Sequence, residues 1–234
     1  MYKKTNAILS LGHAQTEVLR KSGYYGPVIP FPLWFDSSLF RPLDPPQLPS
    51  KKLVVGFVGA LNHQKGLTDL IEAIAKAPWR DQVHLRIVGK GPLQEEVTTL
   101  LTQLPSSEML GSLKAGEMPS FYQSLHLLAV PSRTMPHIKE QFGRVIIEAW
   151  ACGASVIGSS SGEIPKVIDD DSRIFPEGEP DSIAHCIHRV LEELHQHDGP
   201  RKLRQEALTK AEYYSDKSCA RRLAANINEL LRNS

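Results

Sequence analysis

The residues of this sequence best suited to chemistry lie in the stretch EQFGRVIIEAWACG. Two carboxylates, Glu140 and Glu148, stand eight positions apart, with Gly143 and Arg144 between them. The apolar run RVIIEAWA is typical of a helix, and its start brings the backbone N–H groups of Phe142 and Gly143 together. Free N–H groups and the helix dipole favour an anion at such a place. The alternative is a solvated loop acid followed by an acid on a helix surface.

An alternation of strands and helices must position these residues. LVVGFVGA at 53–60 is a continuous apolar run, as expected of a strand buried on both faces of a parallel sheet, and VHLRIVG at 83–89 is predicted to be a second strand. Between them, LTDLIEAIAKA places leucine and isoleucine at i, i+3, i+4 and i+7, the stripe of an amphipathic helix. Further strands are predicted over 109–113, 126–132 and 154–159, and further helices over 93–104, 118–125, 144–153 and 162–168. The sequence therefore predicts an α/β fold with a doubly wound parallel sheet, whose ligand lies beyond the carboxyl ends of the strands.

Both ends of the chain depart from this alternation. After RIFPEG, three helical patterns over 180–194, 201–214 and 217–233 predict a helical C-terminal tail. Near the start, NAILSLG and AQTEVLRKSG predict one strand and one helix, followed by the proline-rich VIPFPLWFDSSLFRPLDPPQLPS. Because proline fixes φ and has no N–H, this stretch is expected to be an extended linker rather than part of a sheet. Residues 1–50 are thus expected to be the end of a preceding domain with its linker, and residues 51–234 one complete domain.

Composition restricts the partners and the compartment. Lys plus Arg number 27 and Asp plus Glu 26, so no basic field attracts nucleic acid and no nucleic-acid role is expected. The three cysteines are widely spaced singles and the histidines lack H-x-x-H or H-E-x-x-H spacing, so no metal site is predicted. No apolar run approaches the roughly 20 residues that span a bilayer, so no transmembrane segment is expected. These features favour a cytoplasmic protein and are compatible with peripheral contact at a membrane.

The order of five motifs resembles a known family. FVGALNHQKG, IVGKGP, FYQSLHLLAVPS, EQFGRVIIEAWACGASVIGS and SGEIPKVI follow one another as in the carboxy-terminal, donor-binding half of the retaining glycosyltransferases of family four. That family has the two-domain GT-B fold. The resemblance covers roughly residues 50–234, and VIPFPLWFDSSLFRP is similar to the family's hinge segment. It implies the Rossmann-like half of a GT-B fold, which binds a nucleotide-sugar.

The resemblance gives the two acids separate expected roles. It implies that Glu148, the second acid of the family's E-x7-E motif, accepts charge-assisted hydrogen bonds from the ribose hydroxyls of the donor. It implies that Glu140 holds hydroxyls of the donor sugar. The amides of Phe142 and Gly143 are then expected to face the diphosphate between them. Arg144 is expected either to support the diphosphate or to form a structural salt bridge.

The expected cations are incomplete. Lys65 in HQKG resembles the family's lysine that neutralises the pyrophosphate as it leaves, where an ammonium stabilises developing charge. The alternative for Lys65 is a surface lysine ahead of a helix. Many members carry an arginine directly after the glycine that corresponds to Gly59, and this sequence has Ala60 there. One of two expected cations is therefore missing, unless Arg144 or Arg133 replaces it.

Two further loops carry weaker expectations. Gly89 and Lys90 in GKGP correspond to a loop near the nucleotide base, and the alternative is an ordinary tight turn. Gly162 in SGEIPKVI corresponds to a segment near the donor. His137 and Lys139 precede the first acid in RTMPHIKEQ, where a solvated loop is the favoured interpretation.

The resemblance implies a retaining glycosyltransferase that moves a hexose from a UDP- or GDP-linked donor to a glycan or lipid-linked acceptor in polysaccharide synthesis. It implies no cofactor beyond this nucleotide-sugar and no metal. Because acceptor groups come from the amino-terminal domain in this family, a separately encoded amino-terminal domain is a candidate partner. Two other hypotheses remain: a module that binds a nucleotide-sugar without transferring it, and a truncated, inactive fragment. A dehydrogenase-type site is disfavoured because the first strand leads to VGALNHQKG rather than G-x-G-x-x-G.

Overall fold

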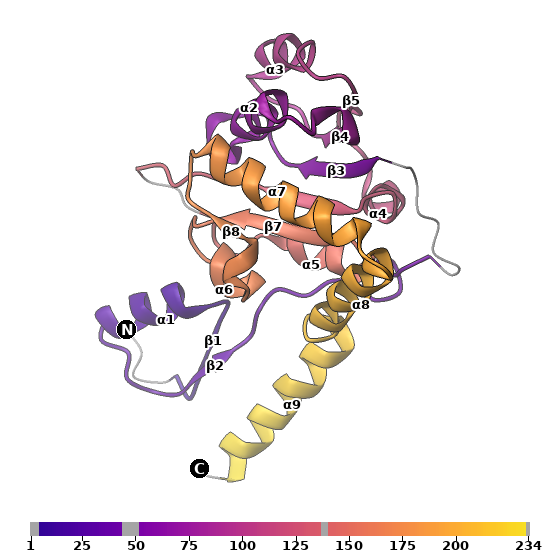
Figure 1. Ribbon diagram of the computed structural model, residues 1–234. Helices are drawn as coiled ribbons and strands as arrows, with labels where there is room; N and C mark the ends of the chain where they lie inside the picture. Colours follow the sequence, from indigo (N-terminus) through magenta and orange to yellow (C-terminus); the bar gives the residue numbers. More distant parts are fainter. Residues whose placement is uncertain (1–4, 44–51, 137–139, 233–234) are drawn as a thin grey trace.

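The computed structural model describes residues 5–43, 52–136 and 140–232, and its main body is a six-stranded parallel sheet between layers of helices (Figure 1). The strands stand side by side in the order β5-β4-β3-β6-β7-β8, and all neighbours are parallel. They are β3 (Leu53–Val58), β4 (Val83–Val88), β5 (Ser107–Met109), β6 (Leu127–Val130), β7 (Ser155–Ser159) and β8 (Ile174–Phe175). The order reverses between β3 and β6, which confirms the doubly wound sheet and puts its switch point at this pair.

A hydrophobic core fills each face of the sheet. Because side chains alternate along a strand, Val55 of β3 packs with α2, α3 and α7 on one face, and Val54 packs with α4, α5, α6 and part of α8 on the other. These helices are α2 (Leu67–Lys76), α3 (Gln94–Leu101), α4 (Met118–Gln123), α5 (Arg144–Ala151), α6 (Ile164–Ile168), α7 (Pro180–His195) and α8 (Gly199–Glu212). The predicted alternation of strands and helices is confirmed at each of them.

Two short strands of the main sheet differ from the prediction. The sequence predicts a strand over 109–113, but β5 ends at Met109, two residues before Gly111 takes a left-handed φ of 67°. Such a φ is incompatible with extended backbone. β8 comprises only two residues and pairs Gly158 with Ile174. A strand this short leaves no periodic pattern, and the sequence gives no prediction for it.

The amino-terminal segment forms a small sheet of its own. β1 (Ile8–Ser10) and β2 (Val28–Pro30) are parallel and are joined by α1 (His13–Lys21). The expectation that the proline-rich stretch takes no part in a sheet is therefore wrong for its first three residues. The N–H of Phe31 donates to the carbonyl of Ser10 at 2.7 Å. Alternate residues face β1, so Pro30 lies toward the open edge, where its missing N–H costs no hydrogen bond.

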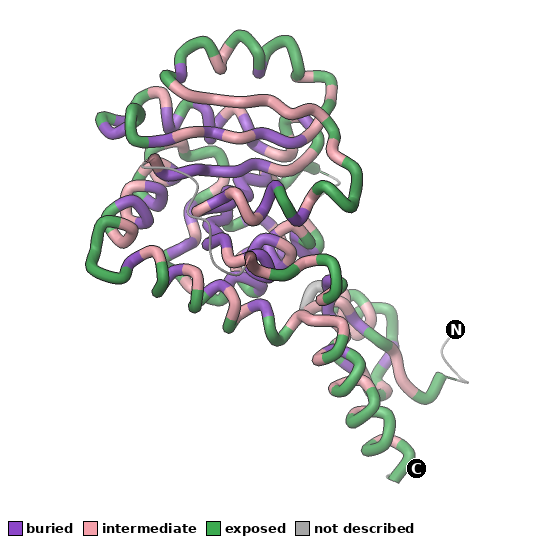
Figure 2. Tube along the Cα trace, turned by 90° about the vertical axis from the view of Figure 1, so that its right-hand side faces the viewer, coloured by how far each residue is buried: buried purple, intermediate pink, exposed green. Residues whose placement is uncertain are grey.

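The helical tail ends in α9 (Asp216–Arg232), which extends away from the main sheet past β1 and β2 (Figure 1). Most of α9 is exposed, and Cys219 is its one buried residue (Figure 2). The predicted helical C-terminal tail is confirmed by α7, α8 and α9. No helix in the described ranges is both long and apolar enough to cross a membrane. The predicted boundary between residues 50 and 51 lies outside the described residues.

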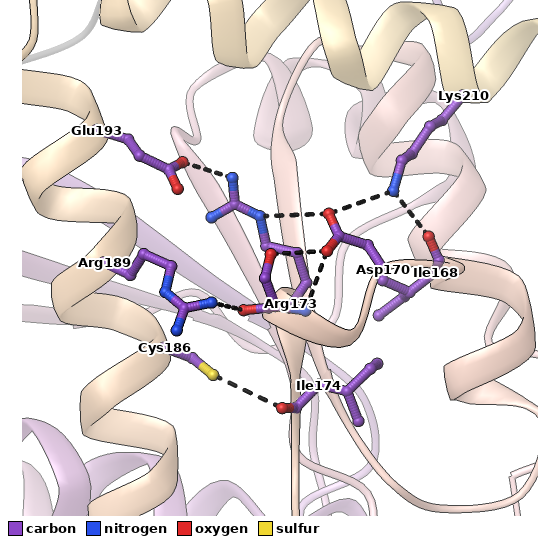
Figure 3. A network of polar contacts seen from close by, with 9 residues as sticks. Ile168, Asp170, Arg173, Ile174, Cys186, Arg189, Glu193 and Lys210 are labelled. Carbon is purple, nitrogen blue, oxygen red and sulfur yellow. Dashed lines mark hydrogen bonds and ion pairs between the residues drawn. The ribbon is translucent and has the colours of Figure 1, made fainter.

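A polar network fixes α7 and α8 to the amino end of β8 (Figure 3). The guanidinium of Arg173, a buried residue directly before β8, pairs with Glu193 of α7. Lys210 of α8 donates to the carbonyl of Ile168 at 2.8 Å and lies 3.8 Å from a carboxylate oxygen of Asp170. Ligands of open α/β sheets bind at the opposite, carboxyl edge, so we assign this network to the stability of the fold.

Candidate functional site

A cavity of about 260 Å³ lies at the switch point of the sheet. Its walls come from the carboxyl ends of β3 and β6 and from the start of α5, the place where a doubly wound sheet binds its ligand. Five of the residues that the sequence singles out line it: Gly59, Lys65, Glu140, Gly143 and Arg144. The fold therefore brings together residues that lie up to 85 positions apart, since the first is Gly59 and the last Arg144.

Lys65 and Glu140 form an ion pair inside this cavity. The ammonium nitrogen of Lys65 lies 2.6 Å from Oε2 of Glu140, and their side chains are 28% and 15% exposed. Ser132 donates a hydrogen bond of 3.3 Å to the same carboxylate oxygen. Lys65 is held at its backbone as well, because its N–H donates to the Asn62 side chain at 3.1 Å. The two groups expected to act on the leaving diphosphate and on the sugar thus neutralise each other in this structure.

Gly162 positions Glu140 rather than lining the cavity. Its φ is +58°, and a Cβ at this position would overlap the carbonyl oxygen of Glu140. The next N–H, that of Glu163, donates to the same carbonyl at 3.1 Å. Only glycine permits this approach of two backbones, so Gly162 is required for the placement of the Glu140 loop.

The two arginines that could replace the missing cation have different environments. Arg133 pairs through two nitrogens with the carboxylate of Asp69, which is buried in α2. The hydrogen bonds that Arg133 donates to Asp69 raise the pKa of Arg133 above its ordinary value. Arg144 is the first residue of α5, is exposed and lines the cavity. No carboxylate of the described residues lies within ion-pair distance of Arg144, so its guanidinium is available to an anionic ligand.

Glu148 lies beside the cavity, four residues after Arg144 on the same side of α5. It is not among the residues that line the cavity. The hydroxyl of Tyr122 donates to its Oε2 at 2.9 Å. Burial raises the pKa of Glu148 above its ordinary value, while the Tyr122 hydrogen bond and the charge of Arg144 act in the opposite direction.

Tyr122 is one of the residues around the site for which the sequence predicts no role. FYQSL is predicted to be part of a helix and begins one of the five family motifs, but Tyr122 itself is given no role; it is fully buried in α4. A buried tyrosine hydroxyl almost always has a hydrogen-bond partner. This rule predicts that a buried Tyr122 has a hydrogen-bond partner, but the sequence does not identify that partner.

Three other singled-out residues have mainly structural surroundings. The Phe142 ring is buried, 5.7 Å from the Tyr214 ring between centroids, so only its backbone faces the helix start. Gly89 has a φ of +152°, and a Cβ there would overlap the carbonyl oxygen of Gly59. Lys90 is exposed and does not line the cavity. Gly89 thus lies in a tight turn, and nearness of the GKGP loop to the nucleotide base stays a prediction.

Metal ligands are not assembled here. In the part of the chain that the structure describes, no group of three or more His, Cys, Asp or Glu side chains is placed to hold a metal ion. His137 and Lys139 lie outside the described residues.

Comparison with known sequences identifies the family of this chain. The family model of glycosyl transferases group 1 matches residues 43–210. The chain belongs to this family. It is 33% identical to an uncharacterized glycosyltransferase of Methanocaldococcus jannaschii over 58% of the chain and 35% of that relative. It is 28% identical to the gpi3 subunit of the phosphatidylinositol N-acetylglucosaminyltransferase of Schizosaccharomyces pombe, over 68% of the chain and 34% of that relative. The chain therefore spans about a third of the length of these curated relatives.

Solved structures have the same fold as this family member. The structure of Anabaena HepE in complex with UDP superposes with a TM-score of 0.77 and 22% identity, over 96% of this chain and 64% of HepE. A glycosyltransferase of Rickettsia africae superposes with a TM-score of 0.78 and 18% identity, over 100% of this chain and 66% of the other. These superpositions confirm the Rossmann-like half of a GT-B fold predicted from the motifs.

Proposed function

We propose that this member of glycosyl transferases group 1 binds a nucleotide-sugar at the switch-point cavity and provides the donor side of a retaining hexosyl transfer. The observation that carries the proposal is the convergence of Lys65, Glu140 and Arg144 on one cavity at the carboxyl edge of the sheet. A diphosphate needs cations and free N–H groups, and a sugar needs hydrogen-bond acceptors. The cavity offers each of these.

In the proposed reaction, the bond between the anomeric carbon and the diphosphate oxygen breaks, and a bond to an acceptor hydroxyl oxygen forms. The proton of that hydroxyl passes to the departing diphosphate. Lys65 and Arg144 stabilise the negative charge that develops on the departing diphosphate. Glu140 accepts hydrogen bonds from sugar hydroxyls, and Glu148 accepts them from the ribose. Because Lys65 and Glu140 bind each other in this structure, the diphosphate of the donor competes with Glu140 for the ammonium.

For the donor we favour a UDP-linked hexose, with a GDP-linked hexose as the alternative. The support is that HepE is a structure in complex with UDP and glucose, at 21% identity. Relatives are named for N-acetylglucosaminyl transfer, among them the N-acetyl-alpha-D-glucosaminyl L-malate synthase of Bacillus anthracis. Others are named for phosphatidylinositol or inositol 3-phosphate. A glycan or lipid-linked acceptor and peripheral contact at a membrane are proposed on the same basis, with polysaccharide synthesis as the process.

We further propose that the amino-terminal half of a GT-B fold packs on β1, β2 and α9, whether it belongs to the same polypeptide or to another chain. In the described residues β1 and β2 pair only with each other, and two-stranded parallel sheets are not normally stable alone. Large apolar side chains of β1, α1 and α9 are exposed, including Leu9 at 50%, Val18 at 65% and Leu231 at 71%. A further layer of strands and helices would cover both the sheet edge and these side chains.

The test is calorimetric titration of the protein with UDP and GDP, followed by a transfer assay with a labelled nucleotide-sugar. We expect binding of a nucleoside diphosphate that Lys65→Ala removes, and transfer only when an amino-terminal GT-B half is present. Binding without transfer in the presence of that half would favour the binding-module hypothesis. No binding would favour the inactive fragment. Robust transfer by the 234-residue chain alone would contradict the need for an added half.

A further inference from the structure

The contact between Tyr122 and Glu148 joins a fully buried hydroxyl to a half-buried carboxylate beside the donor cavity. The hydroxyl donates to Oε2 of Glu148 at 2.9 Å, and Tyr122 is 0% exposed. Burial, and next the charge of Glu148, raise the pKa of Tyr122 well above its ordinary value. Tyr122 therefore keeps its proton at physiological pH and always offers Glu148 a donor.

The ring of Tyr122 has little freedom to move. The Phe40 ring, from the segment after β2, lies 6.1 Å away between centroids, and the Phe121 ring lies 5.8 Å away. The neighbouring Gln123 side chain donates to the carbonyl of Arg41 at 2.7 Å. The segment after β2 and α4 thus hold the ring from two sides, and the hydroxyl is fixed relative to α5.

The carboxylate of a flexible glutamate side chain can rotate. It accepts hydrogen bonds from both hydroxyls of a diol only when the orientation of its plane is fixed. A hydrogen bond from a rigid donor to one oxygen removes that rotation and leaves the other oxygen, together with the remaining lone pair, for a ligand. Phe121, the other aromatic residue of α4, has no group that could do this.

We propose that Tyr122 is a positioning residue for ribose recognition: it holds Oε2 of Glu148 so that the carboxylate faces the 2′- and 3′-hydroxyls of the bound nucleotide. This inference rests on the proposed function, because it requires Glu148 to bind the ribose. It predicts that Tyr122 increases the preference for a ribonucleotide over a 2′-deoxyribonucleotide without contacting the sugar of either.

The test compares UDP with 2′-deoxy-UDP by calorimetry in the parent, Tyr122→Phe, Glu148→Gln and the double variant. Tyr24→Phe is the matched control, because Tyr24 is also buried and donates its hydroxyl to the Pro27 carbonyl at 2.9 Å, outside the main sheet. Thermal unfolding establishes that each variant is folded. A purely structural tyrosine would weaken both nucleotides equally, so the ratio of the two affinities is the informative measurement.

We expect the parent to prefer UDP, and Tyr122→Phe to lower that preference by about tenfold, the scale of one hydrogen bond to a charged group. The double variant should show no smaller preference than Glu148→Gln alone, since Tyr122 acts through Glu148. Tyr24→Phe should keep the parent ratio.

The outcomes separate this inference from the proposed function. If Glu148→Gln removes the preference and Tyr122→Phe keeps it, the positioning role is wrong and the role of Glu148 stands. If Glu148→Gln keeps the preference for UDP, Glu148 does not bind the ribose, and both the proposed role of Glu148 and the positioning role of Tyr122 are wrong. If Tyr122→Phe fails to fold, Phe40→Leu, which loosens the ring without removing the hydroxyl, must lower the ratio in the same direction, and an unchanged ratio overturns the inference.

Discussion

Lys65 and Glu140 are 75 positions apart in the chain and 2.6 Å apart in the fold, joined Nζ to Oε2. β3 ends at Val58, seven residues before the first of them, and β6 ends before the loop that carries the second. The ammonium is therefore already at the edge of the cavity, held by a carboxylate with which a bound diphosphate must compete. Because the pair is partly exposed, water and salt reduce its attraction, and a doubly charged ligand can displace it.

Replacement of Lys65 by alanine should nearly abolish binding of a nucleoside diphosphate. At least one hydrogen bond to a charged group is lost, about 1.5–3 kcal/mol, and the Glu140 carboxylate is left without its counter-ion beside the anion. Calorimetric titration with UDP and GDP measures the effect. The matched control is Lys76→Ala, because Lys76 forms an exposed ion pair with Glu72 on α2, away from the cavity. Parent-like affinity in Lys65→Ala would refute the phosphate role of Lys65.

The local pattern of the sequence is sufficient for the long elements and insufficient for the shortest ones. β3 is a six-residue apolar run, so its burial on both faces is visible in the residues themselves. β4 has the same length, with His84 and Arg86 partly buried at alternate positions. β8 is two residues long and exists because β7 offers a partner. β2 contains a proline, which argues against a strand until the open edge of the small sheet is known. Pairing partners are decided by the whole fold, and no window of sequence contains them.

The candidate site divides in the same way. Gly59, Lys65, Glu140, Gly143 and Arg144 were selected from motifs, and the carboxyl edge of the sheet gathers them as its topology requires. Gly162 was selected for nearness to the donor, whereas its observed contact is with the Glu140 backbone. Tyr122 and Asp69 were not selected. Each looks like an ordinary helix residue until its partner, distant in sequence, is placed against it.

Arg144 and Arg133 should differ in what their loss costs. Arg144→Ala should weaken diphosphate binding by about 1.5–3 kcal/mol and change the free energy of unfolding by less than about 0.5 kcal/mol, since Arg144 is exposed. Arg133→Ala leaves the buried carboxylate of Asp69 unpaired and should destabilise the protein by about 1–3 kcal/mol. Denaturant unfolding of the two variants measures the change in the free energy of unfolding, and calorimetry measures the change in diphosphate affinity. The reverse pattern would make Arg133 the substitute cation.

Restoring a cation at Ala60 should strengthen donor binding. Ala60 is exposed and directly follows Gly59, which lines the cavity. Ala60→Arg should tighten binding of a nucleoside diphosphate by about 1 kcal/mol, the upper range for an exposed ion pair. The gain should shrink as salt rises, because exposed charges are screened. Ala220→Arg, at an exposed position of α9, controls for net charge and should leave affinity unchanged. Equal gains in the two variants would mean that only the overall charge matters.

Ionised Glu148 should lower the stability of the protein without ligand, although it contributes to nucleotide binding. Its pKa is raised from the ordinary value of 4.5, first of all by burial. A carboxyl whose folded-state pKa is raised binds its proton more tightly when folded, so the ionised form costs stability. That cost is absent below the ordinary pKa, grows as pH rises through the raised pKa, and is fully present above it.

Glu148→Gln is therefore expected to keep or slightly raise the melting temperature at pH 7 while it weakens UDP binding by roughly 1.5–3 kcal/mol. Its amide oxygen can still accept from Tyr122, so the packing of α4 on α5 is preserved. At pH 4 the difference in melting temperature should vanish, because the parent carboxyl is then largely protonated. Parent affinity for UDP should also fall on acidification, at a pH above the ordinary pKa. Thermal melts at several pH values test the effect on stability, and titrations at the same pH values test the effect on UDP affinity. A Glu148→Gln variant that melts much lower at pH 7 with unchanged affinity would make Glu148 a structural residue.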